Sequence, residues 1–496
     1  MNFAEALEQA LNNISITENG AIGYKTSGNA LVDLNFAVSS LRSKSDKEIA
    51  DKYTKALEEN KNDAILWLFF ARDVRGGLGE RRLFKVCLPI VVEHVKDVRK
   101  MIRLIPEFGR FDDLYALFGT KYEENVLEFI RDQLNEDSMN YLNHKTVSLL
   151  AKWLKSENTS SKQSRELATK IRQFLRLSSR DYRKVLSTLR SYIDVTEVKM
   201  SANKFGEIDY SKVPSKASLN YKEAFKRHDG ERYQQFIESV NRGEEKINSS
   251  VLFPYEIVHK YWGNYGCFHK TQVDQTIEAL WKNLQDTVGG NGDTLVVADG
   301  SGSMCCAIGK GNTTAWEVAT SLAIYFAERA SGAFKNTYIT FSSRPQLVSL
   351  SGSTLLDNLR IAYEHDECSN TNIKATFDLI LRTAVSNHMP QDDMPKNILI
   401  ISDMEFDYGS SNIPLFKEIE LEYKSYGYEL PRLIFWNVNS RTGTIPLKEN
   451  DRGVVLLSGF STNVVKMAMS GELDPYACLI KTLYSDRYKP IIESLL

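Results

Sequence analysis

The hydrophobic period of this chain changes once, near the glycine-rich segment 289–292, and that change constrains the fold more than any other feature. From about Lys44 to Thr287, apolar residues recur at helical spacing, and strand-like alternation is nearly absent. After residue 292, short apolar runs of strand length alternate with helical stretches. The sequence therefore predicts a multidomain protein, with an all-α domain at 1–288 and an α/β domain at 289–496.

The C-terminal half shows the alternation of strands and helices that is typical of a mostly parallel, doubly wound, Rossmann-like sheet. Apolar runs predict strands at 294–298, 336–341, 346–349, 397–402, 432–437 and 453–457. Amphipathic stretches predict helices at 313–331, 353–363, 373–387, 413–426 and 461–470.

The N-terminal half contains many short helical segments, which predict a HEAT-like α-solenoid. Pro89 is expected to break the first long stretch, and Pro106 to end it. Residues 195–214 are polar and irregular, and we expect an extended connector there. The predicted helices lie near 80–104, 111–118, 122–136, 146–156, 162–175, 179–194, 216–227, 230–242, 254–262 and 272–286.

Composition narrows the class of protein. A chain of 496 residues exceeds what one core usually supports. No apolar run approaches the length of a membrane span, and the N-terminus lacks a basic-then-apolar signal, so we expect a cytoplasmic protein. The six cysteines lack paired metal spacing and are expected to be reduced.

The net charge of −2 hides a local basic excess. Residues 151–230 hold 18 Lys and Arg against 9 Asp and Glu, a net charge of +9. Such a concentration is typical of a surface that binds a polyanion, although ordinary solvated helix faces explain it about equally well.

A short loop after the first predicted strand carries the strongest chemical signal. Asp299, Ser301 and Ser303 alternate with Gly300 and Gly302 directly behind the apolar run 294–298. One carboxylate and two hydroxyls at this spacing can be aimed at one point, and hard oxygen ligands suit Mg²⁺. Open α/β sheets bind ligands beyond the carboxyl ends of their strands, which is where this loop lies.

Two later segments add matching residues. Asp403 follows the apolar run 397–402, and Thr371 lies in a loop before a predicted helix. The alternative is that Asp299 is an ordinary loop acid and that the hydroxyls cap the next helix. The nearby acids Glu405 and Asp407 are interpreted as ordinary charge. Cys305 and Cys306 are interpreted as buried, inert thiols more readily than as a soft metal ligand or a redox switch.

These segments resemble the metal-ion-dependent adhesion site of von Willebrand factor A domains. The resemblance covers roughly residues 290–496, and it implies a magnesium site with an open position for an acidic group of a partner. It departs from the usual pattern at Ser369-Asn370 and at Met404-Glu405, where glycines are common. The implied metal ligands are Asp299, Ser301, Ser303, Thr371 and Asp403.

Two motifs in the helical half resemble the Ro (TROVE) ribonucleoprotein family. The segment 72–82 contains the R-D-x-R-G-G-x-G-E-R pattern of that family, and 105–114 contains I-P-x-x-G-R-F-D-D-L. The chain is most similar to a bacterial and phage branch of unknown function. This resemblance implies a helical ring closed by a von Willebrand A domain, RNA as a partner and a monomeric state.

Basic residues in these segments are the candidates for RNA contact. The glycine-rich turn at 72–82 either approaches a phosphate or simply connects two helices through local ion pairs, and we weigh these interpretations equally. Tyr182 is a candidate for stacking on a base. The candidate RNA-binding residues are Arg72, Arg75, Arg81, Arg172, Arg176, Arg180, Arg183, Lys184, Lys212 and Lys216; the five from Arg172 to Lys184 are expected largely on one helix face where a helix persists.

Three functional hypotheses follow. The first is a non-catalytic, Ro-like RNA-binding protein for RNA quality control or small-RNA scaffolding, with a Mg²⁺-dependent partner site. The alternative is a metal-dependent protein-interaction scaffold that does not bind RNA. An enzyme such as a nuclease is disfavoured, because the sequence shows no cluster of several carboxylates and no nucleophile–base pair.

Overall fold

The computed structural model describes residues 2, 8, 11–262, 272–289, 292–309, 311–409, 413–448, 453–468, 472 and 474–495. It divides the chain into two compact units. The sheet unit comprises Met1–Ala64 and Ser250–Ser485, and the helical unit comprises Ile65–Ser249 and Asp486–Leu496. These boundaries differ from the predicted division at residue 289, since both ends of the helical half belong to the sheet unit. Gly290, Asn291 and Cys267 lie outside the described residues.

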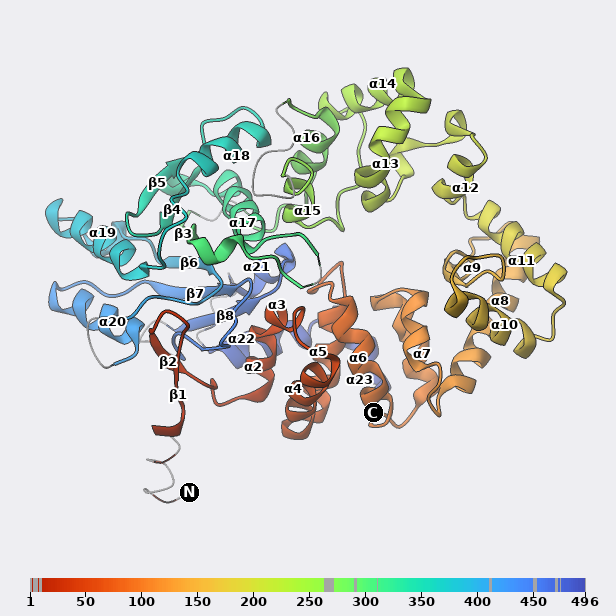
Figure 1. The fold of residues 1–496 in the computed structure, drawn as a ribbon, viewed down its shortest axis with the longest axis horizontal. Coiled ribbons are helices and arrows are strands. Elements are labelled where there is room, and N and C mark those ends of the chain that lie inside the picture. Colours follow the sequence, from red (N-terminus) through yellow and green to blue (C-terminus); the bar gives the residue numbers. More distant parts are fainter. Residues whose placement is uncertain are drawn as a thin grey trace. The chain divides into compact units, whose positions relative to one another are not determined.

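The sheet unit contains a six-stranded sheet in the order β5-β4-β3-β6-β7-β8 (Figure 1). All neighbours are parallel except β4 and β5, which pair antiparallel. The predicted mixture of a helical region and an α/β region is therefore confirmed. The strands are β3 (Thr294–Asp299), β4 (Thr337–Phe341), β5 (Gln346–Ser349), β6 (Asn397–Ser402), β7 (Arg432–Asn437) and β8 (Val454–Ser458).

The central strands are apolar on both sides because helices cover both faces of the sheet. On one face, alternate residues such as Val297 and Ile400 join a core with Phe377 of α19 (Ile373–Ser386) and Phe416 of α20 (Leu415–Ser425). On the other face, Trp436 of β7 packs edge-on against Phe326 of α17 (Ala315–Arg329), with ring centroids 5.9 Å apart. Because helices pack on both faces of the sheet, the ends of its strands are held in fixed positions.

The remaining helices of the sheet unit include segments from the predicted helical half. Those before the sheet are α2 (Ala30–Phe36), α3 (Val38–Leu41), α4 (Asp46–Glu59), α15 (Pro254–Val258) and α16 (Gln275–Lys282). Those within and after it are α18 (Leu355–Glu364), α21 (Val465–Ala468) and α22 (Pro475–Leu483). Helix α5 (Lys61–Arg72) contains the boundary between the two units.

An N-terminal hairpin, which sequence periodicity did not predict, pairs with a later segment of the sheet unit. Strands β1 (Ile14–Ile16) and β2 (Ile22–Tyr24) are antiparallel, and Tyr24 exchanges two backbone hydrogen bonds of 2.8 and 2.9 Å with Ile445. Gly23 permits this approach, because a Cβ there would lie 2.6 Å from the Ile445 carbonyl oxygen. The hairpin tip is thereby held at the loops that follow β6 and β7.

The helical unit is a succession of helices, as predicted, although two prolines lie inside helices where breaks were expected. Pro89 is within α6 (Arg81–Val92) and Pro106 within α7 (Val98–Phe108). The region expected as an extended connector contains a short helix, α12 (Thr196–Ser201). The other helices are α8 (Glu123–Leu142), α9 (Leu150–Trp153), α10 (Lys162–Phe174), α11 (Ser179–Tyr192), α13 (Ser215–His228), α14 (Gly230–Asn241) and α23 (Lys489–Leu495).

A buried ion pair joins the two motif segments of the helical unit. The guanidinium of Arg72 lies 2.7 Å from the Asp113 carboxylate, and the two side chains are 2% and 0% exposed. The backbone N–H of Arg110 donates a further 2.9 Å hydrogen bond to Asp113. In the turn after α5, a Cβ on Gly77 would lie 1.9 Å from the Phe70 carbonyl oxygen, so only glycine fits.

Candidate metal centre at the carboxyl edge of the sheet

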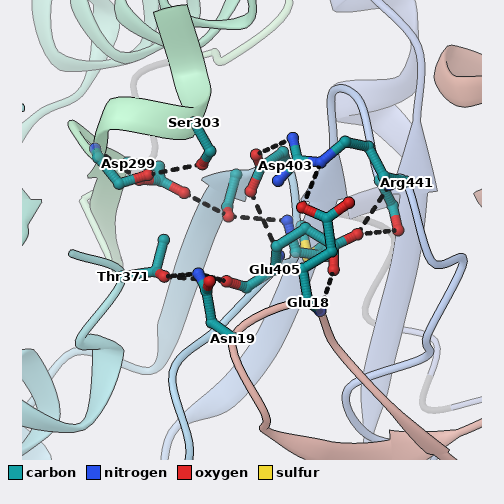
Figure 2. Close-up of polar contacts among 12 residues, drawn as sticks. Glu18, Asn19, Asp299, Ser303, Thr371, Asp403, Glu405 and Arg441 are labelled. Atoms are coloured by element: carbon teal, nitrogen blue, oxygen red, sulfur yellow. Dashed lines mark hydrogen bonds and ion pairs between the residues drawn. The ribbon is translucent and has the colours of Figure 1, made fainter. Parts of the chain in front are cut away.

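The two acids predicted as metal ligands follow neighbouring parallel strands. Asp299 ends β3, and Asp403 comes directly after β6, which pairs with β3 in register. The Asp299 carboxylate accepts hydrogen bonds from the Ser301 backbone N–H at 2.9 Å and from the Ser402 hydroxyl at 2.6 Å. The Ser301 and Ser303 hydroxyls are 3.0 Å apart, and the Ser303 side chain lies near Asp299 (Figure 2).

The third predicted segment meets the first at the same edge. The backbone N–H of Gly302 donates a 3.0 Å hydrogen bond to the Ser369 carbonyl, two residues before Thr371. The buried Thr371 hydroxyl lies 2.9 Å from both the Glu405 carbonyl oxygen and the Asp407 carboxylate. The structure therefore gathers all five predicted residues from three loops at one edge of the sheet.

The two acids are both buried, but they differ in their charged partners. Asp299 and Asp403 are 2% and 0% exposed. Burial raises the pKa of Asp299 to about 8, and the negative charge of Asp403 adds to the rise. Burial also raises the pKa of Asp403, although Arg441 and a hydrogen bond from Ser303 oppose this shift. Burial and a neighbouring negative charge both disfavour the ionised form of Asp299.

Arg441 and the hairpin tip complete the polar network, and no sequence signal pointed to them. The Arg441 guanidinium donates to Asp403 at 2.9 Å and to the Glu18 carboxylate at 2.7 Å. The Asn19 amide group donates to the Thr371 hydroxyl at 2.6 Å and to the Glu405 carbonyl oxygen at 2.7 Å. The tip of the N-terminal hairpin therefore touches the loops that carry two of the predicted ligands (Figure 2).

Glu405 anchors these loops, which corrects its interpretation as ordinary surface charge. Its side chain is fully buried. Its carboxylate accepts hydrogen bonds from the backbone N–H groups of Glu18, Arg441 and Thr442 at 2.9, 2.7 and 2.9 Å. The Ser440 and Thr442 hydroxyls add further contacts. Its position two residues after Asp403 was the only available clue in the sequence.

The residues at this edge fit a hard divalent cation. The hydrogen bonds described for Asp299 come from neutral donors, and the Arg441 ion pair compensates only Asp403. In the described part of the chain, no group of three or more His, Cys, Asp or Glu side chains is placed to hold a metal. The five predicted residues offer two carboxylates and three hydroxyls, and hard oxygen donors of this kind suit Mg²⁺ better than a soft metal.

The structure separates the predicted RNA-binding residues into buried and exposed groups. Arg72 is buried against Asp113, and Tyr182 is fully buried with its hydroxyl donating to the Lys155 carbonyl at 2.9 Å. Neither can reach a ligand, because each is enclosed by its own unit. Arg172 is committed to a 2.7 Å ion pair with Glu157.

The basic residues that were expected on one helix face are divided between α10 and α11, because the chain leaves the helical conformation between these two helices. Arg176 lies in this break with a φ of +54° and therefore does not share a helix face with Arg180. Of the remaining candidates, Lys212 pairs with Asp209 at 2.9 Å, whereas Arg75, Arg81 and Lys216 are exposed. Helix α11 carries three exposed basic side chains at helical spacing, those of Arg180, Arg183 and Lys184.

Comparisons with known proteins place the chain in a family. Residues 126–294 match a domain of unknown function (DUF2828), and residues 293–477 match a second one (DUF7788). The chain is 30% identical over 515 residues to the uncharacterized protein L728 of Acanthamoeba polyphaga mimivirus, covering 95% of this chain and 87% of that protein. The chain belongs to the same family as this mimivirus protein.

Among solved structures, the Deinococcus radiodurans RO (RSR) protein shows a remote likeness. The TM-score is 0.35 at 13% identity, over 88% of this chain and 92% of that chain. Among the described helices, none is both long and apolar enough to cross a membrane.

Proposed function

We propose that the sheet unit is a non-catalytic binding module that holds a divalent cation at Asp299, Ser301, Ser303, Thr371 and Asp403. The observation that carries this proposal is the buried Asp299–Asp403 pair, which lies on the loops that carry Ser301 and Ser303 and for which the described residues provide an ion-pair partner to Asp403 alone. A bound Mg²⁺ would supply the charge on which the carboxylate of a partner protein could be placed. In binding an acidic group through a metal ion, the proposed module would resemble a von Willebrand factor A domain.

Selection of peptides tests which group the module accepts. Random peptides displayed on phage are bound to the protein in Mg²⁺ and eluted with EDTA. We expect the eluted peptides to be enriched in Asp or Glu, and an Asp299→Asn variant to lose that enrichment. Peptides without acidic enrichment, or the same peptides from the variant, would contradict the proposal. Asp293→Asn is a matched control, because Asp293 precedes the opposite end of β3 and is 54% exposed.

A second function, binding of single-stranded RNA, is favoured by the exposed face of α11. Arg180, Arg183 and Lys184 lie at spacings of three and four and therefore share one face of the helix. Among the residues that the structure describes, no ion pair involves Arg180 or Lys184. Cations that are not already paired within the protein can contact phosphates without first breaking a bond. This proposal makes the helical unit the RNA-binding part of the protein.

Removal of the three charges should weaken RNA binding and its dependence on salt. For the variant Arg180→Ala/Arg183→Ala/Lys184→Ala, we expect the slope of log K against log salt to become shallower by about 2, at about 0.7 for each lost phosphate contact. Fluorescence anisotropy with a labelled single-stranded RNA measures this. The control removes equal charge through Arg99→Ala/Arg103→Ala/Arg131→Ala, whose guanidinium groups pair with Glu128 and Asp132. Equal effects of the two triple variants would rule out a site on α11.

A further inference from the structure

Two exposed thiols lie side by side on the loops that carry the candidate metal ligands. Cys305 ends the short 3₁₀ turn Gly302–Cys305, two residues after Ser303. Cys368 lies in the loop between α18 and α19, three residues before Thr371. Their Sγ atoms are 3.8 Å apart although the residues are separated by 63 positions in the sequence. Both are exposed, as is Cys306, so the expectation that Cys305 and Cys306 are buried is wrong; Cys87 and Cys478 are buried.

The backbone already holds the two thiol-bearing loops together. The hydrogen bond from the Gly302 N–H to the Ser369 carbonyl joins them at 3.0 Å, and both of its residues neighbour the thiol-bearing segments. A disulfide requires the sulfur atoms to approach to about 2.05 Å, a closure of about 1.8 Å from the distance seen here. Side-chain rotation and a small loop shift supply such a movement. Cys368 also has a φ of +45°, a conformation that residues other than glycine rarely adopt.

Other roles for the thiol pair fit the surroundings less well. The nearest described carboxylate is that of Asp366, whose Oδ2 is 3.8 Å from the Cys368 sulfur. Among the described residues, no group of three His, Cys, Asp or Glu side chains is placed to hold a metal, so the pair does not form a soft-metal site.

We propose that Cys305 and Cys368 are a reversible disulfide site that locks the loops carrying Ser301, Ser303 and Thr371. The oxidant is a small-molecule disulfide such as glutathione disulfide. One cysteine thiolate attacks it and releases one small thiolate, and the second cysteine then displaces the other from the mixed disulfide. In total, the two cysteines lose two protons and two electrons, and the small disulfide gains both to become two thiols. The bond ties the ligand-bearing loops in one arrangement.

The consequence for the cation site rests on the proposed function. Loops that are fixed before the cation arrives lose less conformational freedom on binding. We therefore expect the oxidised protein to bind Mg²⁺ several-fold more tightly than the reduced protein.

Mass spectrometry tests the disulfide independently of the metal. The full-length protein is incubated for hours with glutathione disulfide, alkylated and digested without reduction. We expect a linked peptide that joins Cys305 to Cys368 and disappears on treatment with a reducing agent. Cys306→Ser is the matched control and should keep the link, whereas Cys305→Ser and Cys368→Ser should lose it. Absence of the linked peptide, or linkage through Cys306 instead, would overturn the proposal.

Titration of Mg²⁺ into the oxidised and reduced forms completes the test. A several-fold gain on oxidation that is absent in Cys305→Ser supports coupling between the disulfide and the site. Equal affinities of the two forms would overturn the coupling. Absence of Mg²⁺ binding in both forms would refute the proposed cation site and with it the coupling, while the linked peptide would still report whether the disulfide forms.

Discussion

Substitution of Asp299 by Asn should abolish stabilisation of the sheet unit by Mg²⁺. The wild-type protein should gain about 2.7 kcal/mol in free energy of unfolding when Mg²⁺ reaches 100 times its Kd, because the cation binds only the folded state. The variant should gain nothing, since it lacks the acid of the Asp299–Asp403 pair that has only neutral hydrogen-bond donors among the described residues. Thermal unfolding followed with and without Mg²⁺ measures the difference.

The same variant should behave differently in EDTA. There, Asp299→Asn places a neutral amide at a buried position where the charged carboxylate is disfavoured, and the amide can still accept the hydrogen bond from Ser301. We expect its free energy of unfolding to equal or exceed that of the wild type. Asp293→Asn should follow the wild type in both conditions. A variant that is strongly destabilised in EDTA would show that Asp299 is needed for the fold and not for a cation.

Substitution of Asp113 by Ala should be the most damaging change in the helical unit. It leaves the Arg72 guanidinium, which is 2% exposed, without its carboxylate in the core. Breaking a buried ion pair from one side costs about 3–5 kcal/mol, because the remaining charge stays desolvated. Urea denaturation of the full-length protein measures the loss.

Two further variants separate the ion pair from simple loss of side-chain atoms. Asp132→Ala removes a partly exposed acid, 44% exposed, that pairs with Arg103 and Arg131, and it should cost less than about 1 kcal/mol. The double variant Arg72→Met/Asp113→Leu should recover part of the loss, because it leaves no unpaired charge. If Asp113→Ala costs no more than Asp132→Ala, the pair does not organise this unit.

The sheet and the position of the loop after β3 could be predicted because their signals are local. A strand buried on both faces is a short apolar run, and each run from 294–298 onwards corresponds to a strand within one or two residues. Asp299, Ser301 and Ser303 could be recognised by their spacing alone. Asp403 followed from the rule that parallel strands end at one edge of a sheet, and Thr371 from the resemblance to the adhesion site of von Willebrand factor A domains.

The rest depends on contacts between residues far apart in the sequence. Glu18 and Asn19 reach the site through a hairpin whose short strands gave no periodic signal, and Arg441 lies 38 positions after its partner Asp403. Charge alone did not show that Arg72 faces inward, since its partner lies 41 positions away. The break at Arg176 arises from a left-handed residue that is not glycine, which sequence spacing does not reveal.

The domain boundary shows the same limitation. The change of hydrophobic period near residue 289 marks where strands begin, and residues 1–64 and 250–288 nevertheless belong to the sheet unit. Helices that cover a sheet have the same amphipathic period as helices that cover one another, so period does not assign them to a unit.

Direct counting of bound metal tests the central claim, which is a cation site built on Asp299. Mn²⁺ substitutes for Mg²⁺ at oxygen-rich sites, and the electron paramagnetic resonance signal of free Mn²⁺ falls as the protein binds it. The wild-type protein and Asp293→Asn should each bind one Mn²⁺ at this site, in competition with Mg²⁺, and Asp299→Asn should not bind it. Retention of that Mg²⁺-competed Mn²⁺ by Asp299→Asn, or its absence from the wild type, would contradict the account.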